Sequence, residues 1–156
     1  MSTKAGVGFS EKPNSRDAAL EATEAALRQA GINRCDLILL FATSKHDPVI
    51  LQEGVRSIVG DPPRLFGGSA AGVITNDRLG YEGYQVGVAV IDSDSMKVDA
   101  FIEKGLPDNE YRVGKNLGAQ LRDQPLPNML LLFDIVKKGS SAEGMSMNMA
   151  TPLLQG

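Results

Sequence analysis

The segment Arg64–Thr75, with the sequence RLFGGSAAGVIT, contains the residue types from which proteins build close contacts between a backbone and a ligand. Gly67, Gly68 and Gly72 carry no side chain, so the chain can bend there and present N–H groups to a bound molecule. Ser69 adds a hydroxyl that could act as a nucleophile. The pattern is compatible with a phosphate loop, a nucleophile turn, a small-ligand contact or a structural bend without chemistry.

Two of these interpretations fail on spacing. A phosphate loop of the Walker type needs lysine and then serine or threonine after its last glycine, whereas Val73 and Ile74 stand there. The hydrolase motif G-x-S-x-G needs a glycine at the position of Ala71. Near the N-terminus, GVGFSE fails as a dinucleotide fingerprint, because Glu11 replaces its last glycine. A small-ligand contact and a structural bend remain open for the glycine segment.

His46, the one histidine of the chain, follows an apolar run in the loop TSKHDP. In open α/β sheets, ligands collect beyond the carboxyl ends of the strands. We therefore expect Thr43, Ser44 and His46 to face such a crevice together with the glycine segment. A relay between Ser69 and His46 would make a small serine hydrolase, but nothing in the spacing requires it. A solvated loop histidine, a ligand contact and an axial haem ligand are the other interpretations of His46.

The sulfur-containing side chains are predicted to be structural. Met145, Met147 and Met149 could bind soft Cu(I), but no cysteine or histidine stands beside them, and Met145, Met149 and Leu153 have the spacing of a helical core stripe. Cys35, the only cysteine, rules out an intramolecular disulfide and precedes an apolar run, so we expect a packed thiol. We predict no metal site and no cofactor from these residues.

The composition argues against several classes of function. With 156 residues, 42% of them hydrophobic, the chain is expected to form one compact domain. Aromatic residues make up 5%, tryptophan is absent and the formal net charge is −3, which argues against nucleic-acid binding. The longest apolar run, LILLFA, is far shorter than the roughly 20 residues of a membrane helix, and the N-terminus has no signal-peptide pattern. We expect a cytoplasmic protein with no membrane partner.

The elements that must position these residues follow the alternating order of an α/β fold. Asn14 or Ser15 is the expected cap of the first helix and Gly31 its stop, while Asp47 and Gly60 bound the second. The apolar run that precedes His46 is typical of a strand buried on both faces. In chain order we expect a strand at 4–10, a helix at 16–30, a strand at 36–43, a helix at 48–59 and a short strand at 64–68.

The second half of the chain is predicted to add an antiparallel hairpin and further α/β elements. The runs GYQVGVAVI and MKVDAFIEKG, separated by DSDS, predict a hairpin around residues 84–104. A helix over 109–124, weakened by Gly114 and Gly118, is followed by a buried strand over 127–134 and a poor final helix. The predicted architecture is α/β, with a mostly parallel sheet flanked by helices and this added hairpin.

In order, GVGFS, DLILLFAT, LFGGSAAGVIT and MLLLFD resemble the N-terminal half of FIST domains, which are signal-transduction sensory modules of bacteria and of some eukaryotic F-box proteins. The resemblance spans nearly the whole chain. Val73 stands where an acidic residue is common in the family, so a ligand contact through a carboxylate is not carried over. The glycine motif of the family usually reads G-C/G-S-T/S-A-G-E-I, and it is matched at Gly67, Gly68, Ser69, Ala71, Gly72 and Ile74.

The resemblance implies a non-catalytic, intracellular sensory domain that binds a small ligand, such as an amino acid or a similar metabolite, and acts on a second FIST lobe or an effector domain. Because a subset of the family is associated with haem and nitric oxide sensing, the resemblance also implies a haem or nitric oxide sensor as an alternative. A small serine hydrolase and an interaction or oligomerisation lobe, for instance a homodimer, are further alternatives. The ligand-binding residues that we expect are Thr43, Ser44, His46, Gly67, Gly68, Ser69, Ala70 and Gly72.

The tripeptide LLF occurs in two of the predicted strands, at Leu39–Phe41 and at Leu131–Phe133. Each copy is followed by a polar loop and a helical pattern, which is what an internal repeat would produce. If the repeat is genuine, a second glycine bend would begin just after Gly156. Residues 1–156 would then be a single lobe that lacks the second half of the full sensor domain.

Overall fold

Capping residues set the ends of the first two helices in the computed structural model, which describes residues 2–122 and 128–133. Helix α1 (Ser15–Ala30) begins after Asn14, whose side chain accepts a hydrogen bond from a backbone N–H of the first turn, and it ends at Gly31, which adopts the left-handed conformation. Helix α2 (Pro48–Val59) is capped in the same way by Asp47. The structure confirms both predicted helices and their caps.

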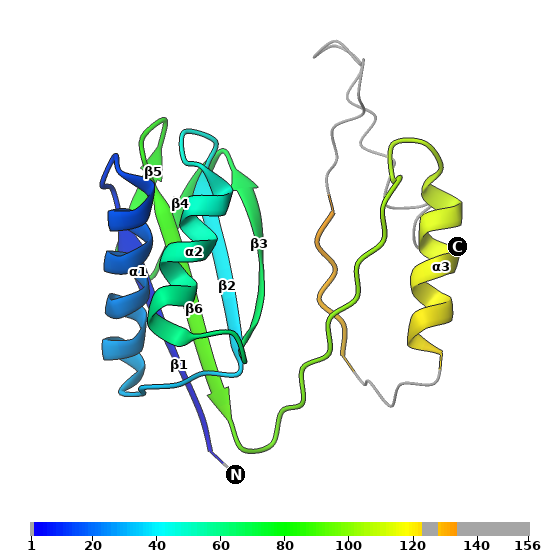
Figure 1. Ribbon diagram of the computed structural model, residues 1–156, viewed down its shortest axis with the longest axis horizontal. Coiled ribbons are helices and arrows are strands. Elements are labelled where there is room, and N and C mark those ends of the chain that lie inside the picture. Colours follow the sequence, from blue (N-terminus) through cyan, green and yellow to red (C-terminus); the bar gives the residue numbers. More distant parts are fainter. Residues whose placement is uncertain (1, 123–127, 134–156) are drawn as a thin grey trace. The chain divides into compact units, whose positions relative to one another are not determined.

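Four strands form the main sheet in the order β1–β6–β2–β3 (Figure 1). Their bounds are β1 Thr3–Ser10, β6 Val86–Ser93, β2 Leu37–Thr43 and β3 Arg64–Ala70. Strands β1, β2 and β3 run in one direction, and β6 runs antiparallel between β1 and β2. The predicted α/β class with flanking helices is confirmed, but the sheet is mixed instead of mostly parallel. The reason is that β6 separates β1 from β2, which leaves β2–β3 as the parallel pair of this sheet.

A second, two-stranded sheet is the antiparallel hairpin of β4 (Gly72–Ile74) and β5 (Leu79–Tyr81). An added hairpin was predicted, but around residues 84–104, and that placement is wrong. Strand β6 is paired along both edges, with β1 and with β2, so it has no edge left for the segment 96–105. That segment contains no strand.

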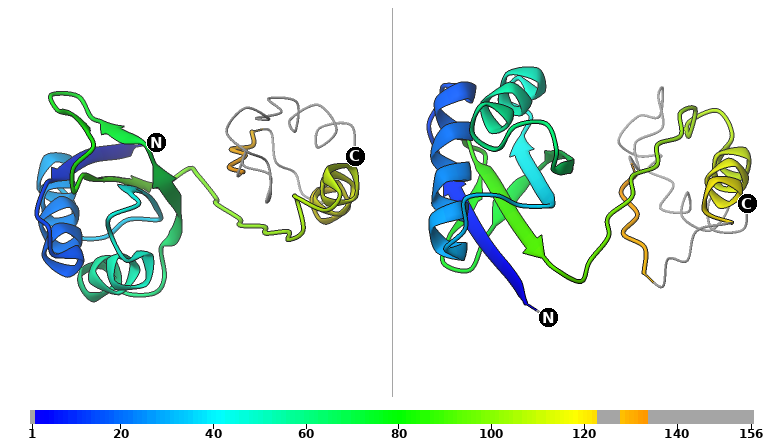
Figure 2. Two further views of the ribbon diagram at one scale, coloured as in Figure 1. Left: turned by 90° about the horizontal axis from the view of Figure 1, so that it is seen from above. Right: turned by 60° about the horizontal axis from the view of Figure 1, so that its bottom comes forward.

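Helices α1 and α2 lie side by side over one face of the four-stranded sheet (Figures 1 and 2). Gly8 lets α1 approach β1 closely, because a Cβ atom at that position would lie 1.9 Å from the carbonyl oxygen of Ala22. The buried core between the sheet and the helices contains mainly aliphatic side chains and alanines, among them Ala18, Ala19, Ala22, Ala26, Ile38, Leu40, Leu51, Val55, Val86, Val88 and Val90.

The opposite face of this sheet, which we call the open face, is covered by no helix among residues 2–99. The alternation of each strand places Val7, Leu39, Phe41, Phe66 and Ala89 on this face, and all five are half-buried. The unbroken apolar run of β2 predicted a strand buried on both faces, and that prediction is wrong for residues 2–99. Its apolar character has a different cause, since one face meets the helices and the other forms an apolar floor.

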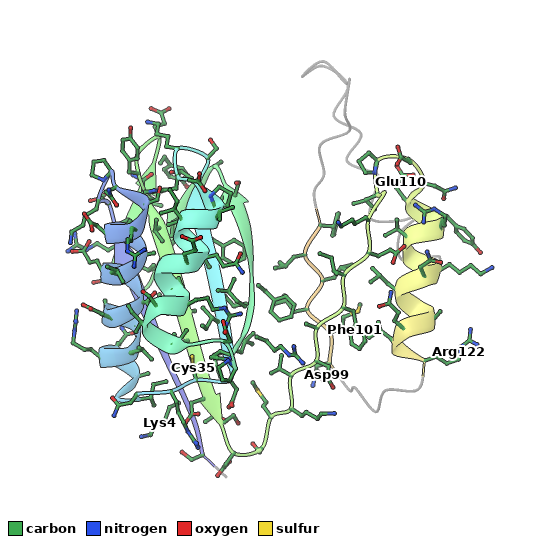
Figure 3. The ribbon with its side chains drawn as sticks, in the orientation of Figure 1. Lys4, Cys35, Asp99, Phe101, Glu110 and Arg122 are labelled. Atoms are coloured by element: carbon green, nitrogen blue, oxygen red, sulfur yellow. The ribbon has the colours of Figure 1, made fainter. Side chains whose placement is uncertain are left out.

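The chain divides into two compact units, Met1–Asp99 and Ala100–Gly156. In the second unit, helix α3 (Glu110–Leu121) confirms the helix that we predicted there, and Figure 3 labels residues at its two ends. The carboxylate of Glu103 accepts a hydrogen bond of 2.8 Å from the side-chain amide of Asn116, which joins the extended stretch before α3 to the helix. That residues 1–156 form one lobe of a larger sensor stays a prediction.

The buried strand predicted over 127–134 is not observed in its described part, 128–133, which has no regular secondary structure. Met129 and Leu130 are 61% and 62% exposed, and no described strand pairs with this segment, which a strand needs for its backbone hydrogen bonds. The predicted final helix, with Met145, Met147, Met149 and Leu153, lies outside the described residues. Among the described helices, none has the length and apolar character needed to cross a membrane.

Candidate functional site

The carboxyl ends of β2 and β3 meet, as predicted, with Thr43 opposite Ala70 in the parallel register. Thr43 is buried, and its hydroxyl donates a hydrogen bond of 2.7 Å to the carbonyl oxygen of Gly83. The ammonium group of Lys45 donates to the carbonyl oxygen of Glu82 and lies 5.3 Å from the centroid of the Tyr84 ring. These contacts hold the turn before β6 against the end of β2, so Thr43 has a structural partner, while the adjacent Ser44 is exposed.

His46 is buried, with 6% of its surface exposed. Its Nδ1 atom lies 3.1 Å from the hydroxyl of Ser15 at the start of α1, and the same hydroxyl accepts a hydrogen bond from the backbone N–H of Asp47. The ring meets that of Tyr84 edge-on, with 5.6 Å between the centroids. His46 therefore joins the start of α1, the loop after β2 and the turn before β6. Nε2 is buried without a hydrogen-bond partner among the described residues.

This environment does not suit the two chemical roles considered for His46. A serine relay needs a hydrogen bond between His46 and Ser69, but the hydroxyl on Nδ1 belongs to Ser15, and Ser69 is exposed on β3 with no bond to His46. An axial haem ligand needs a ring nitrogen that is open to the iron, whereas Nε2 is buried within the protein. The residues present do not fit a haem at this position. Within the described ranges, no group of three or more histidine, cysteine or acidic side chains could hold a metal ion.

The glycine segment is mostly strand and not the bend that we predicted. Gly67, Gly68 and Ser69 continue β3, and the chain leaves the strand at Ala71 before β4 begins. At Gly67, β3 approaches β2 so closely that a Cβ atom would lie on the carbonyl oxygen of Leu40. This glycine therefore permits a close approach of two strands, for which its missing side chain is needed, and its φ is not positive.

A groove of about 560 Å³ lies on the open face of the sheet, beside the β4–β5 hairpin. The hairpin forms one wall, because the buried side chain of Val73 lies over Gly87 of β6, where a Cβ atom would come within 2.6 Å of Val73 Cγ1. The lining is mostly apolar and is drawn from β1, β2, β6 and the end of β3 with the hairpin: Val7, Leu39, Phe41, Ala70, Gly72, Val73, Ile74, Thr75, Asn76, Gly87, Val88 and Ala89.

Of the eight predicted site residues, Ala70 and Gly72 line this groove. Thr43, Ser44, His46, Gly67, Gly68 and Ser69 are not among its lining residues, and their role in ligand binding stays a prediction. Sequence reasoning missed Leu39 and Phe41, which it placed in a strand buried on both faces, and Ala89, which it placed in the predicted hairpin. The period-two alternation of the strands separates these residues from the core residues, but it does not tell which of the two faces the helices cover. A smaller hollow of about 290 Å³, at the C-terminal end of α1, contains none of the predicted site residues.

Cys35, labelled in Figure 3, lies just before the start of β2, whereas His46 follows the other end of the same strand. Burial raises the pKa of its thiol to about 11, and the neighbouring carboxylates of Asp36 and Asp92 contribute to the shift. At neutral pH the group is therefore a neutral thiol, which is the packed and unreactive state that the sequence predicted.

We expect the free energy of unfolding to fall as the pH rises from about 9 to about 11. The folded chain holds the Cys35 proton to higher pH than the unfolded chain, so the stabilisation is complete below the unfolded pKa and is lost as the pH rises through the folded one. Urea unfolding between pH 8 and 11 measures this, with Cys35→Ala as the control because alanine does not titrate. An equal decline in both proteins would contradict the prediction.

Comparison with known proteins gives one family match. The model of the FIST N domain matches residues 36–152. Among solved structures, an FtsZ mutant from M. jannaschii is 19% identical with a TM-score of 0.37, over 58% of this chain and 27% of that one. An empty FtsZ dimer from M. jannaschii is 14% identical with a TM-score of 0.35, over 65% of this chain and 34% of that one. These likenesses are too low to support an argument, and this chain spans only about a third or less of those proteins. No curated protein matches the sequence.

Proposed function

The chain belongs to the FIST N domain family, a family of signal-transduction sensory domains, and on that premise we propose that it binds a small ligand in the groove beside the β4–β5 hairpin. The observation that supports the proposal is the groove itself. Its volume of about 560 Å³ falls within the roughly 300–1,000 Å³ that is usual for small-molecule sites. Ala70 and Gly72, from the segment that matches the family's glycine motif, contribute to its wall.

The arrangement also supports a route from binding to signalling. A ligand in the groove would touch the sheet through Leu39 and the hairpin through Val73, and these belong to two separate sheets. A ligand that contacts both sheets best in one relative position shifts the population toward that position. In this proposal the hairpin transmits the shift to a second FIST lobe or an effector domain. The contacts of Thr43 and Lys45 hold the turn that follows the hairpin. Thr43, one of the predicted site residues, therefore supports the placement of the hairpin.

The test is a thermal-shift screen of amino acids and related metabolites on the full chain, repeated on a variant with a filled groove. Ala89→Phe places a phenyl ring on the floor of the groove, between Val7 and Leu39 in the register. We expect at least one compound to raise the melting temperature of the unmodified chain and to lose its effect in Ala89→Phe, because a ligand that binds only the folded state stabilises it.

The matched control is Ala5→Phe, the same replacement on β1, on the same open face of the sheet but outside the groove. It should retain the response to the stabilising compound. If no compound stabilises the chain, or if the stabilising compounds act equally on Ala89→Phe, the groove is not the ligand site.

A further inference from the structure

We infer that the groove takes an uncharged molecule with an apolar body and one neutral hydrogen-bonding end, in preference to a zwitterionic amino acid. The inference rests on the proposed function, since it concerns the ligand of the same groove. It follows from three properties of the lining: the shape of the floor, the absence of charged side chains among the lining residues, and the position of the polar groups.

The floor of the groove is apolar, and it is lower along β6 than along β2. In the register of the sheet, Phe41 lies opposite Gly87 and Leu39 lies opposite Ala89. Each large side chain of β2 is therefore paired with a position of β6 that has little or no side chain. The result is an apolar surface with a low centre, bounded on the hairpin side by Val73. Such a surface fits a planar or narrow hydrocarbon body, which gains free energy when it leaves water.

The lining residues carry no charged side chain. Arg64, the charged residue on the open face of β3, stands opposite Leu37 at the far end of that strand and does not line the groove. Asp77, in the turn of the hairpin, accepts a hydrogen bond from the hydroxyl of Thr75 at 3.4 Å. A free amino acid would bring an ammonium and a carboxylate, each of which loses water on binding and needs an opposite charge to compensate. A lining without charged side chains therefore favours a neutral ligand over a zwitterion.

The polar side chains of the lining, Thr75 and Asn76, adjoin each other in the turn that joins β4 to β5. The backbone N–H of Thr75 is already bonded to the carbonyl oxygen of Arg78 at 2.9 Å, which fixes this turn. Asn76 is exposed, and its side-chain amide offers both a donor and an acceptor without charge. A ligand that carries an amide, carbonyl or hydroxyl at one end could lay its apolar body on the floor and bond that end to Asn76.

The first experiment titrates the full chain with N-phenyl-1-naphthylamine, a neutral aromatic probe that fluoresces in apolar surroundings. We expect a saturable rise in fluorescence in the unmodified chain and in Ala5→Phe, and at least a tenfold weaker affinity in Ala89→Phe. Circular dichroism of each variant establishes that it is folded before the titration is interpreted.

The second experiment compares two displacing compounds with the same phenyl group, L-phenylalanine and 3-phenylpropanamide. The first is a zwitterion and the second is neutral. We expect 3-phenylpropanamide to displace the probe at concentrations at least tenfold lower, and we expect this advantage to shrink in Asn76→Ala, which keeps the apolar floor but removes the amide.

The outcomes separate this inference from the proposed function. Tighter binding of L-phenylalanine that is lost in Ala89→Phe would overturn the uncharged class and leave the groove as the ligand site. If neither compound nor the probe binds, or if binding is unchanged in Ala89→Phe, both this inference and the proposed function are overturned. A loss of probe binding as the chain dimerises with rising concentration, measured by sedimentation, would show that a second copy covers the groove, and would also overturn the inference.

Discussion

Replacing Gly8 with alanine is expected to lower the free energy of unfolding by about 3 kcal/mol, the upper part of the range for overpacked cores. The new methyl carbon would lie 1.9 Å from the carbonyl oxygen of Ala22 and 2.7 Å from the backbone nitrogen of Ala26. Both are backbone atoms of α1, so no side-chain rotation can relieve the contact. The helix must move away from β1, and the alanine residues that fill their interface lose their packing. Urea unfolding followed by circular dichroism measures the change.

Gly68→Ala is the matched control for this replacement. It is also a glycine-to-alanine change within a strand, so the effect on the entropy of the unfolded chain is the same. A Cβ atom at Gly68 would meet no other atom within 4 Å, and we expect a change of no more than about 0.5 kcal/mol. Equal destabilisation by the two changes would show that the close packing of α1 on β1 does not contribute to stability.

His46→Ala is expected to destabilise the chain by about 2 kcal/mol. The change removes a buried ring, its edge-on contact with Tyr84 and its hydrogen bond with Ser15, and these contacts join three segments of the fold. The measurement is chemical unfolding, combined with the N-phenyl-1-naphthylamine titration under conditions where the variant is folded. We expect stability to fall while the affinity of the probe stays within about twofold.

Ser44→Ala, two residues earlier in the same loop, provides the comparison. Ser44 is exposed, so its replacement should alter stability by no more than about 0.5 kcal/mol. If His46→Ala left stability unchanged and abolished probe binding, His46 would be a ligand contact, as the sequence alone had led us to expect, and its structural role would be wrong.

Local signals were sufficient for the helices, and the reason is that a helix is stabilised by residues close in sequence. Asn14 and Asp47 accept hydrogen bonds from the first turns of their helices, and Gly31 takes the left-handed conformation that ends α1. The pairing of the strands depends on residues far apart in the chain. Nothing in the composition of 86–93 indicates that this strand lies between β1 and β2. For that reason the sheet is mixed instead of mostly parallel, and the added hairpin lies at β4–β5 instead of around residues 84–104.

The site was predicted less well than the fold. The glycine motif led to Ala70 and Gly72, which line the groove. The presence of a glycine in the sequence, however, does not tell whether the chain bends there or two strands approach each other closely. Gly67 is the second case, since its missing side chain leaves room for the backbone of Leu40. The apolar floor was missed because Leu39 and Phe41 have the same residue types as core. They differ from core in that both helices pack on the opposite face, a tertiary arrangement that the sequence of β2 does not encode.

The place of β6 in the sheet has a consequence for the order in which the chain can fold during synthesis. Strands β1 and β2 are synthesised before β6. They do not pair with each other in the finished sheet, because β6 lies between them and pairs with both. A nascent chain that ends before Val86 therefore lacks the strand that connects β1 to the rest of the sheet, along with the core side chains of that strand. Contacts between residues far apart in the sequence slow folding, and strand edges that stay exposed during that time promote aggregation. Until β6 is available, β1 and β2 each keep a strand edge unpaired that the finished sheet covers.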